Sequence, residues 1–146
     1  MSLACRLCFF VVLLAAHSIS FAETFGDRAE AKQLADRVML KVAADKMEEA
    51  VRLTQPFYTS ATESEFNVIL EGAKEKHPGM LADCGKTVDV ELIREDKAGE
   101  NLFRLTYLQR CEKRPMRWVF YFYRAKDRWT LYWFFWDEDI TQIFPQ

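Results

Sequence analysis

Few residues of this chain have the types and spacing that enzyme catalysis requires. A serine or cysteine nucleophile needs a positioned base, and beyond residue 22 the sequence has one histidine, His77, next to Pro78. This position is typical of a solvent-exposed helix end. The sequence contains no glycine-rich phosphate loop, H-E-x-x-H motif or EF-hand spacing. We therefore predict no catalytic residues, and an acid/base site built from a buried carboxylate and Tyr107 or Tyr121 stays open as an alternative.

A metal site is also weakly indicated. Three adjacent carboxylates, Asp137, Glu138 and Asp139, have the oxygen chemistry that calcium prefers. Successive side chains at a strand end point in alternating directions, so all three cannot reach one ion without a loop. We predict no metal site and no cofactor.

Two cysteines, Cys84 and Cys111, lie beyond residue 22. If residues 96–99 form a hairpin loop, Glu95 pairs with Glu100, and the same register continued places Cys84 opposite Cys111. Cysteines on facing strands lie within bonding reach, so we predict a structural disulfide. Two free thiols are one alternative. A redox-active pair or a metal site is another, which the absence of a C-x-x-C motif and of further ligands disfavours.

The N-terminus has the layout of a secretory signal peptide. Arg6 precedes an apolar run over residues 7–16, and the small-x-small triplet at 20–22 follows. The run is shorter than the roughly 20 residues of a membrane-spanning helix. We predict a signal peptide over residues 1–22, cleaved near Ala22, and one domain over 23–146 in the periplasm or secreted, without stable membrane insertion. An uncleaved anchor or a buried helix is the alternative.

Helical periodicity dominates the first half of the predicted domain. Residues 27–44 carry apolar side chains at helical spacing. A second helix is expected to start at Asp45, whose spacing to Glu48 resembles a capping box, and to end at Pro56. The same spacing from Thr62 to Glu65 predicts a third helix that stops at residues 77–79, His-Pro-Gly.

After Gly85 the apolar period changes to two, which is typical of strands. Four strands follow, separated by turn residues at 96–99, by Pro115 and by the polar turn at 126–127. The order of elements predicts an α+β fold in which N-terminal helices pack on one face of a four-stranded antiparallel meander.

The last two strands carry aromatic side chains on both faces, whereas a sheet covered on one side usually alternates apolar and polar residues. The face opposite the helices would then expose more apolar area than soluble monomers normally tolerate. Strong curvature or residues 140–144 could cover this face, as could a second copy of the chain in a homodimer or a protein partner; a ligand cavity would also explain it. The predicted interface residues are Val119, Tyr121, Tyr123, Tyr132, Phe134 and Trp136.

Basic residues are concentrated beside these aromatic strands, although the chain has a net charge of −2. In an exported protein we expect no nucleic-acid partner, and an anionic glycan, lipopolysaccharide or an acidic protein surface fits better. Solvated hairpin ends with arginines on edge strands are the structural alternative. The candidate basic patch contains Arg110, Lys113, Arg114, Arg117, Arg124 and Arg128.

Four segments resemble small exported bacterial domains of unknown function with cystatin-like or nuclear transport factor 2-like folds. These segments are DKMEEA at 45–50 leading to QPF at 55–57, SEF at 64–66 and the closing strand WTLYWF at 129–134. The resemblance implies helices wrapped by a curved sheet, a cone that some members keep open as a pocket, and sheets that often dimerise. No catalytic residue of such families matches a numbered position here.

These observations favour a non-enzymatic periplasmic binding domain that acts through its aromatic sheet face, with a protein partner or with itself as a homodimer. An inhibitor or immunity protein that blocks a secreted enzyme is one concrete version. The alternative from another class is a cone-pocket enzyme or small-ligand carrier.

Overall fold

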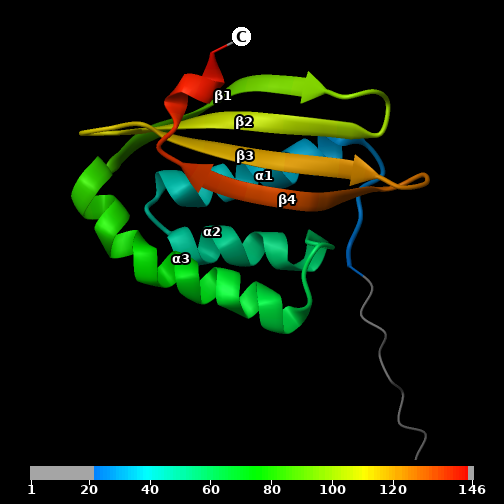
Figure 1. The fold of residues 1–146 in the computed structure, drawn as a ribbon, viewed down its shortest axis with the longest axis horizontal. Coiled ribbons are helices and arrows are strands. Elements are labelled where there is room, and N and C mark those ends of the chain that lie inside the picture. Colours follow the sequence, from blue (N-terminus) through cyan, green and yellow to red (C-terminus); the bar gives the residue numbers. More distant parts are fainter. Residues whose placement is uncertain (1–21, 145–146) are drawn as a thin grey trace, which may run out of the picture.

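The structure is a computed structural model that describes residues 22–144. The predicted signal peptide therefore lies outside the described residues, apart from Ala22. Three α-helices come first and four strands follow, with two short 3-10 helices, which confirms the α+β class (Figure 1). The elements are α1 (Arg28–Ala43), α2 (Met47–Thr54), η1 (Gln55–Phe57), α3 (Glu63–Cys84), β1 (Thr87–Lys97), β2 (Leu102–Cys111), β3 (Met116–Arg124), β4 (Trp129–Asp137) and η2 (Ile140–Ile143).

Helix α1 is the layer that lies directly against the sheet. The Asp27 side chain caps its first turn by accepting a hydrogen bond from the Glu30 amide. Its apolar stripe, which includes Leu34 and Val38, is fully buried and contacts β1, β2 and β4. Helix α2 packs against α1, and α3 packs against α2, so the helices form a series beginning at the sheet (Figure 1).

The predicted start of α2 is wrong in detail. Asp45 does not cap this helix; its carboxylate accepts hydrogen bonds from the amide and the hydroxyl of Thr87, at 3.3 and 2.7 Å. Asp45 has a φ of +56°, in the left-handed region that favours glycine and asparagine. The residue therefore turns the chain between α1 and α2 and ties this turn to the start of β1.

Helix α3 begins as predicted and ends later than predicted. The capping box between Thr62 and Glu65 is present. The helix then continues through Pro78 to Cys84, and Gly85 ends it with a φ of +81°. Proline removes one helical hydrogen bond, but Pro78 is exposed, so water can satisfy the carbonyl oxygen that this leaves free. The prediction that this helix stops at residues 77–79 is therefore wrong.

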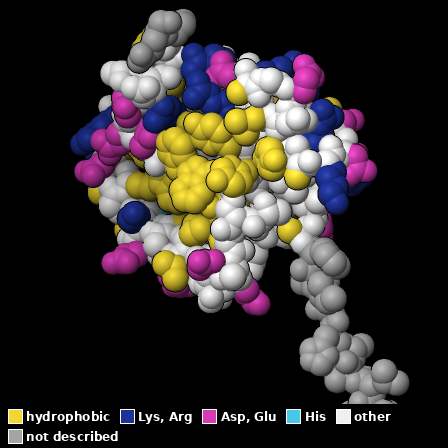
Figure 2. All heavy atoms as spheres, turned by 45° about the vertical axis from the view of Figure 1, so that its right-hand side comes forward, with side chains coloured by type: hydrophobic (Ala, Val, Ile, Leu, Met, Phe, Trp, Pro, Cys, Tyr) yellow, Lys and Arg dark blue, Asp and Glu magenta, His cyan; other side chains and the backbone are white. Residues whose placement is uncertain are grey.

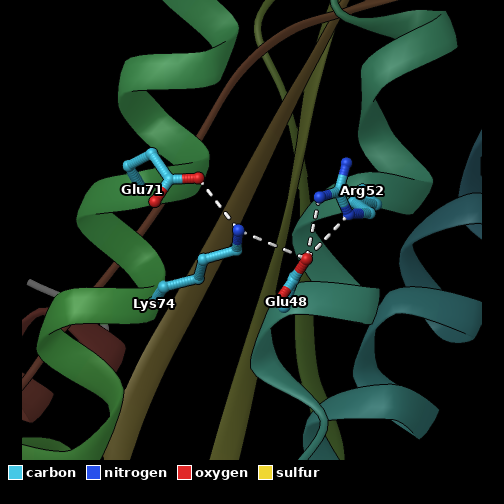
Figure 3. A network of polar contacts seen from close by, with 4 residues as sticks. All are labelled: Glu48, Arg52, Glu71 and Lys74. Carbon is cyan, nitrogen blue, oxygen red and sulfur yellow. Dashed lines mark hydrogen bonds and ion pairs between the residues drawn. The ribbon is translucent and has the colours of Figure 1, made fainter.

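An ion network joins α2 to α3 (Figure 3). The Glu48 carboxylate accepts from Arg52 at 2.8 Å and lies 3.5 Å from the Lys74 ammonium, which also contacts Glu71 at 2.9 Å. The Arg52 hydrogen bond is the main reason that the pKa of Glu48 lies below its usual value. Because all four side chains are partly exposed, the network orients the two helices more than it stabilises them.

The sheet is the predicted antiparallel meander, with strand order β1-β2-β3-β4. The first hairpin turns at residues 98–101, two residues later than predicted, and pairs Lys97 with Phe103. Two register shifts in β1 leave Val88 and Ile93 as extra residues in the ladder. The predicted register of this hairpin is therefore wrong, since a turn displaced by two residues changes every pair that follows.

Large aromatic side chains fill the space between the sheet and the helices. Trp118, Phe120 and Phe122 of β3 are completely buried, and Phe103 of β2 stacks on Phe122 with ring centroids 4.9 Å apart. We call this side of the sheet the inner face and the opposite side the outer face. In the described part of the chain, no helix combines the length and apolarity needed to cross a bilayer.

Candidate functional site

One extra residue in β4 determines which aromatic side chains reach the outer face. Tyr121 pairs with Trp133 and Phe122 pairs with Leu131, which leaves Tyr132 unpaired as a β-bulge. Before the bulge Leu131 points inward and is fully buried. Beyond it the alternation is shifted by one residue, so that Phe134 also points inward.

The bulge corrects two of the predicted interface residues. Phe134 is buried and its ring packs against Tyr58 and Phe120 in the core. Trp136 is partly buried, packs against the same core and stacks on Trp118 with ring centroids 4.9 Å apart. In a strand without a bulge, Phe134 and Trp136 would both lie on the outer face, as predicted. The bulge moves both rings to the inner face, so that prediction is wrong.

Trp133 and Phe135 take the outward positions instead. Trp133 pairs with Tyr121, and Phe135 pairs with Val119 and stacks on the Tyr121 ring at 6.4 Å. No glycine or proline marks the bulge in the run from Trp129 to Trp136. The sequence therefore carries no local signal that could have indicated these two residues.

Val119 lies on the outer face as predicted, yet only 2% of its surface is exposed. The C-terminal segment η2 contacts β3 here, and the Arg94 guanidinium on β1 donates to the carbonyl oxygen of Ile143 at 3.2 Å. Thr106 on the neighbouring strand is also buried. Residues 140–144, expected from the sequence as one possible cover, thus lie over part of the outer face.

The remaining outer residues of β3 and β4 form an aromatic surface, defined as Tyr121, Tyr123, Tyr132, Trp133 and Phe135. Tyr123, Tyr132 and Trp133 are 42%, 53% and 48% exposed. The Tyr123 and Tyr132 rings meet edge to face at 6.5 Å. Figure 2 shows hydrophobic side chains gathered in one continuous area of the molecular surface, surrounded by charged groups of both signs. Exposed aromatic groups in such numbers are unusual on a surface without a partner.

Ion pairs flank the aromatic surface and hold its arginines in place. Arg117 binds Asp137 through two hydrogen bonds of 3.0 and 2.5 Å, and its guanidinium lies 5.4 Å from the centre of the Phe135 ring. The bond to Asp137 raises the pKa of Arg117. The guanidinium is therefore permanently charged and oriented beside the aromatic rings.

A second ion cluster occupies the outer side of the first hairpin. Arg94 and Arg104 each donate to the Asp96 carboxylate at 2.8 Å, and Arg104 pairs with Tyr121 across the β2–β3 ladder. Partial burial opposes the ionisation of Asp96, but the two arginines outweigh this effect and keep the pKa of the carboxyl below its usual value.

The candidate basic residues do not form a single patch. Arg117 and Arg124 lie near opposite ends of β3, about 23 Å apart at 3.3 Å per residue. Each of the six side chains has a partner: Asp89 for Arg110, the Ala82 carbonyl for Lys113, Glu138 for Arg114, Asp137 for Arg117, Asn101 for Arg124 and Thr24 for Arg128. The prediction of one basic patch is therefore wrong, because successive hairpins carry their basic ends to opposite edges of the molecule.

Cys84 and Cys111 lie together, but not on facing strands. Cys84 ends α3 and is buried, whereas Cys111 ends β2, where it pairs with Thr87. Both cysteines are in the reduced form, and the Cys84 thiol donates to the Gly85 carbonyl oxygen at 3.2 Å. Burial, then the contact with Cys84, raises the pKa of Cys111 to about 12. The predicted cross-strand register is wrong, and the bond itself stays a prediction.

The remaining candidates for catalysis occupy structural positions. His77 lies between a cavity of about 10 Å³ that it lines with Cys84 and an open surface pocket of about 250 Å³ that it lines with Glu48 and Arg52; among the residues that the structure describes, no nucleophilic serine, threonine or cysteine lines the larger pocket. The Tyr107 hydroxyl donates to the Asp36 carboxylate at 2.7 Å, and burial raises the pKa of this tyrosine. Among residues 22–144, no three histidine, cysteine or acidic side chains are grouped as metal ligands.

Comparison of the chain with protein-family models, with curated proteins and with solved structures finds no match in any of the three. The α+β class is thus established by the coordinates themselves. The cystatin-like or nuclear transport factor 2-like assignment stays a prediction.

Proposed function

We propose that this protein is a non-enzymatic binding domain that engages a protein partner through its aromatic surface. The observation that carries the proposal is the exposure of Tyr123, Tyr132 and Trp133 side by side on a rigid sheet. Tryptophan, tyrosine and arginine are the residues that contribute most to binding energy at protein interfaces. Here the first two lie in one surface, with Arg117 stacked at its edge.

The geometry favours binding because the surface is already ordered. The bulge at Tyr132 brings the adjacent rings of Tyr132 and Trp133 to the outer side of β4. The edge of β4 is tied down by the Ser60 hydroxyl, which donates to the Tyr132 carbonyl, and by the Thr59 amide, which donates to Leu131 at 3.2 Å. A partner that docks here would lose little free energy to ordering of these side chains.

The compartment belongs to the same proposal. Residues 1–22 support export, followed by cleavage near Ala22 and residence in the periplasm or secretion. Phe25 supports this processing, because its amide and carbonyl exchange hydrogen bonds with Trp129 at 2.8 and 2.9 Å. The domain would therefore remain anchored from its first residues after cleavage. An inhibitor or immunity protein of cystatin-like or nuclear transport factor 2-like fold agrees with these properties.

The inner face offers less support for a small-ligand carrier or a cone-pocket enzyme. Trp118, Phe120 and Phe122 occupy the place where such a pocket would open, and each is fully buried. We therefore propose no second function of that class. A homodimer through the outer face would use the same aromatic surface. Light scattering on the free protein, described below, distinguishes a homodimer from a complex with another protein.

The test is a binding experiment with matched variants. Immobilised wild-type protein, Trp133→Ala and Val68→Ala are exposed to periplasmic extract and to free wild-type protein. Val68 is a control because it is 73% exposed on α3, on a different element from the aromatic surface. We expect one defined partner to be retained by the wild type and by the control, and its affinity to fall about thirtyfold in Trp133→Ala, as for a hot-spot residue.

Light scattering on the free protein measures its oligomeric state, which shows whether the binding of free wild-type protein reflects self-association. If Trp133→Ala retains every bound protein as well as the control does, the aromatic surface is not the binding site. Circular dichroism of both variants establishes that the loss is not caused by unfolding.

A further inference from the structure

The second half of α3 has few attachments to the rest of the molecule. Phe66, Leu70 and Ala73 bury the first half of the helix in the core. The next fully buried residue is Cys84, at the last position, and Pro78 interrupts the helical hydrogen bonds between them. Met80 packs partly against the core and the Lys113 ammonium donates to the Ala82 carbonyl at 2.7 Å, so Cys84 is the one fully buried side chain that attaches the helix end.

Cys84 is held at the open end of the β1–β2 pair. The Lys113 amide donates to the Cys84 carbonyl at 2.8 Å, and the Glu112 amide donates to the Lys86 carbonyl at 3.0 Å. Cys111 directly precedes Glu112 and Lys113 in the chain, so these two hydrogen bonds hold it beside Cys84. The backbone thus makes the two cysteines neighbours before any covalent bond forms, and the nearness of Cys84 contributes to the raised pKa of Cys111.

We propose that Cys84 and Cys111 form a disulfide that fastens the end of α3 to the sheet. This bond would connect a helix to a strand, whereas the register expected from the sequence would connect two strands. Two cysteines whose backbones are already held side by side, through the Lys113 amide and the Cys84 carbonyl, need little backbone movement to bond. The inference does not rest on the proposed binding function, because neither cysteine belongs to the aromatic surface.

The reaction is a thiol–disulfide exchange with an acceptor disulfide such as oxidised glutathione. Cys111 is the more accessible thiol; as a thiolate it attacks one acceptor sulfur, which forms a mixed disulfide and releases one glutathione thiolate. The Cys84 thiolate then attacks the Cys111 sulfur and releases the second glutathione. Both protein thiols lose their protons, the protein loses two electrons, and the acceptor disulfide is reduced to two thiols.

Peptide mapping of the full chain under non-reducing conditions tests the bond directly. After treatment with oxidised glutathione, we expect the peptides that contain Cys84 and Cys111 to be linked, and dithiothreitol to separate them. Mapping also distinguishes this bond from any that involves Cys5 or Cys8. If iodoacetamide modifies both thiols completely in the glutathione-treated folded protein, the proposal is overturned.

Hydrogen exchange tests the mechanical role of the bond in the unmutated protein. We expect the amides of residues 79–84 to exchange about tenfold more slowly after oxidation, while those of residues 66–73 change little. Cys84→Ala provides the control, because its exchange should not respond to oxidised glutathione. Equal exchange in the linked and reduced proteins would show that the bond does not hold the helix.

Discussion

The two faces of the sheet are built from similar side chains but are stabilised in different ways. On the inner face, Trp118 and Phe120 are completely enclosed by helices and neighbouring strands. On the outer face, Tyr121 pairs with Trp133 and with Arg104, and both rings keep contact with water. Aromatic content alone therefore does not distinguish a core from a binding surface, and the helices together with the β-bulge decide which face is which.

Deletion of single residues at the bulge tests this conclusion and is expected to change the free energy of unfolding the most. Deletion of Tyr121 from β3, which has no extra residue, would turn half of that strand over and expose core aromatics. We expect it to destabilise the domain by more than about 4 kcal/mol. Deletion of Tyr132 would remove the bulge and leave Phe134 inward, so we expect a loss of about 1 kcal/mol, mainly its contact with Tyr123.

Urea denaturation followed by tryptophan fluorescence measures both deletions. Similar losses of stability in the two deletion variants would contradict this prediction. They would mean that β4 needs Tyr132 to keep Phe134 and Trp136 in the core.

Alanine substitution at adjacent residues of β3 gives the next largest effect. We expect Phe120→Ala to lower the free energy of unfolding by about 4 kcal/mol, since it leaves a cavity in a fully buried site. Tyr121→Ala, one residue further along the same strand, should cost about 1 kcal/mol because its ring is only partly buried. Both values come from urea titrations at pH 7.

Equal losses at the two positions would mean that the outer face is as tightly packed as the inner face. In that case Tyr121 would be a core residue, and the binding proposal would lose its physical basis.

Much of this architecture could be predicted from the sequence because it depends on local patterns. The capping box at Thr62 and the apolar stripe after it indicate α3. Alternation of apolar and polar residues indicates β1 and β2, and aromatic runs bounded by turn residues indicate β3 and β4. The end of α3 could not be predicted, since an exposed proline can be tolerated inside a helix. The turn of the first hairpin lies later than predicted because Asp96 and Lys97, typical turn residues, extend β1. They pair with Arg104 and Phe103 of β2, and Asp96 also accepts a hydrogen bond from Arg104.

The candidate surface was less predictable than the fold. Tyr121, Tyr123 and Tyr132 follow from alternation, and their exposed or half-exposed positions agree with it. Trp133 and Phe134 exchange faces because one bulge shifts the rest of β4, and neighbouring aromatic residues give no sign of where an extra residue is accommodated. The covering of Val119 by η2 depends on a contact between distant parts of the chain, which local periodicity does not report.

The smallest effect concerns how the outer face depends on pH. Because the pKa of Asp96 is lower in the folded protein than in the unfolded chain, its ion pairs with Arg94 and Arg104 stabilise the fold above the unfolded pKa, near 4. This contribution is lost as the pH falls through the lower folded value. We expect Asp96→Asn to cost less than about 1 kcal/mol at pH 7, because the carboxylate is partly exposed, and to cost progressively less as the pH is lowered towards 2. Phe120→Ala should cost the same at both pH values, since packing carries no charge.

A pH-independent loss for Asp96→Asn would mean that hydrogen bonding to Arg94 and Arg104, rather than the charge of Asp96, holds this side of the hairpin.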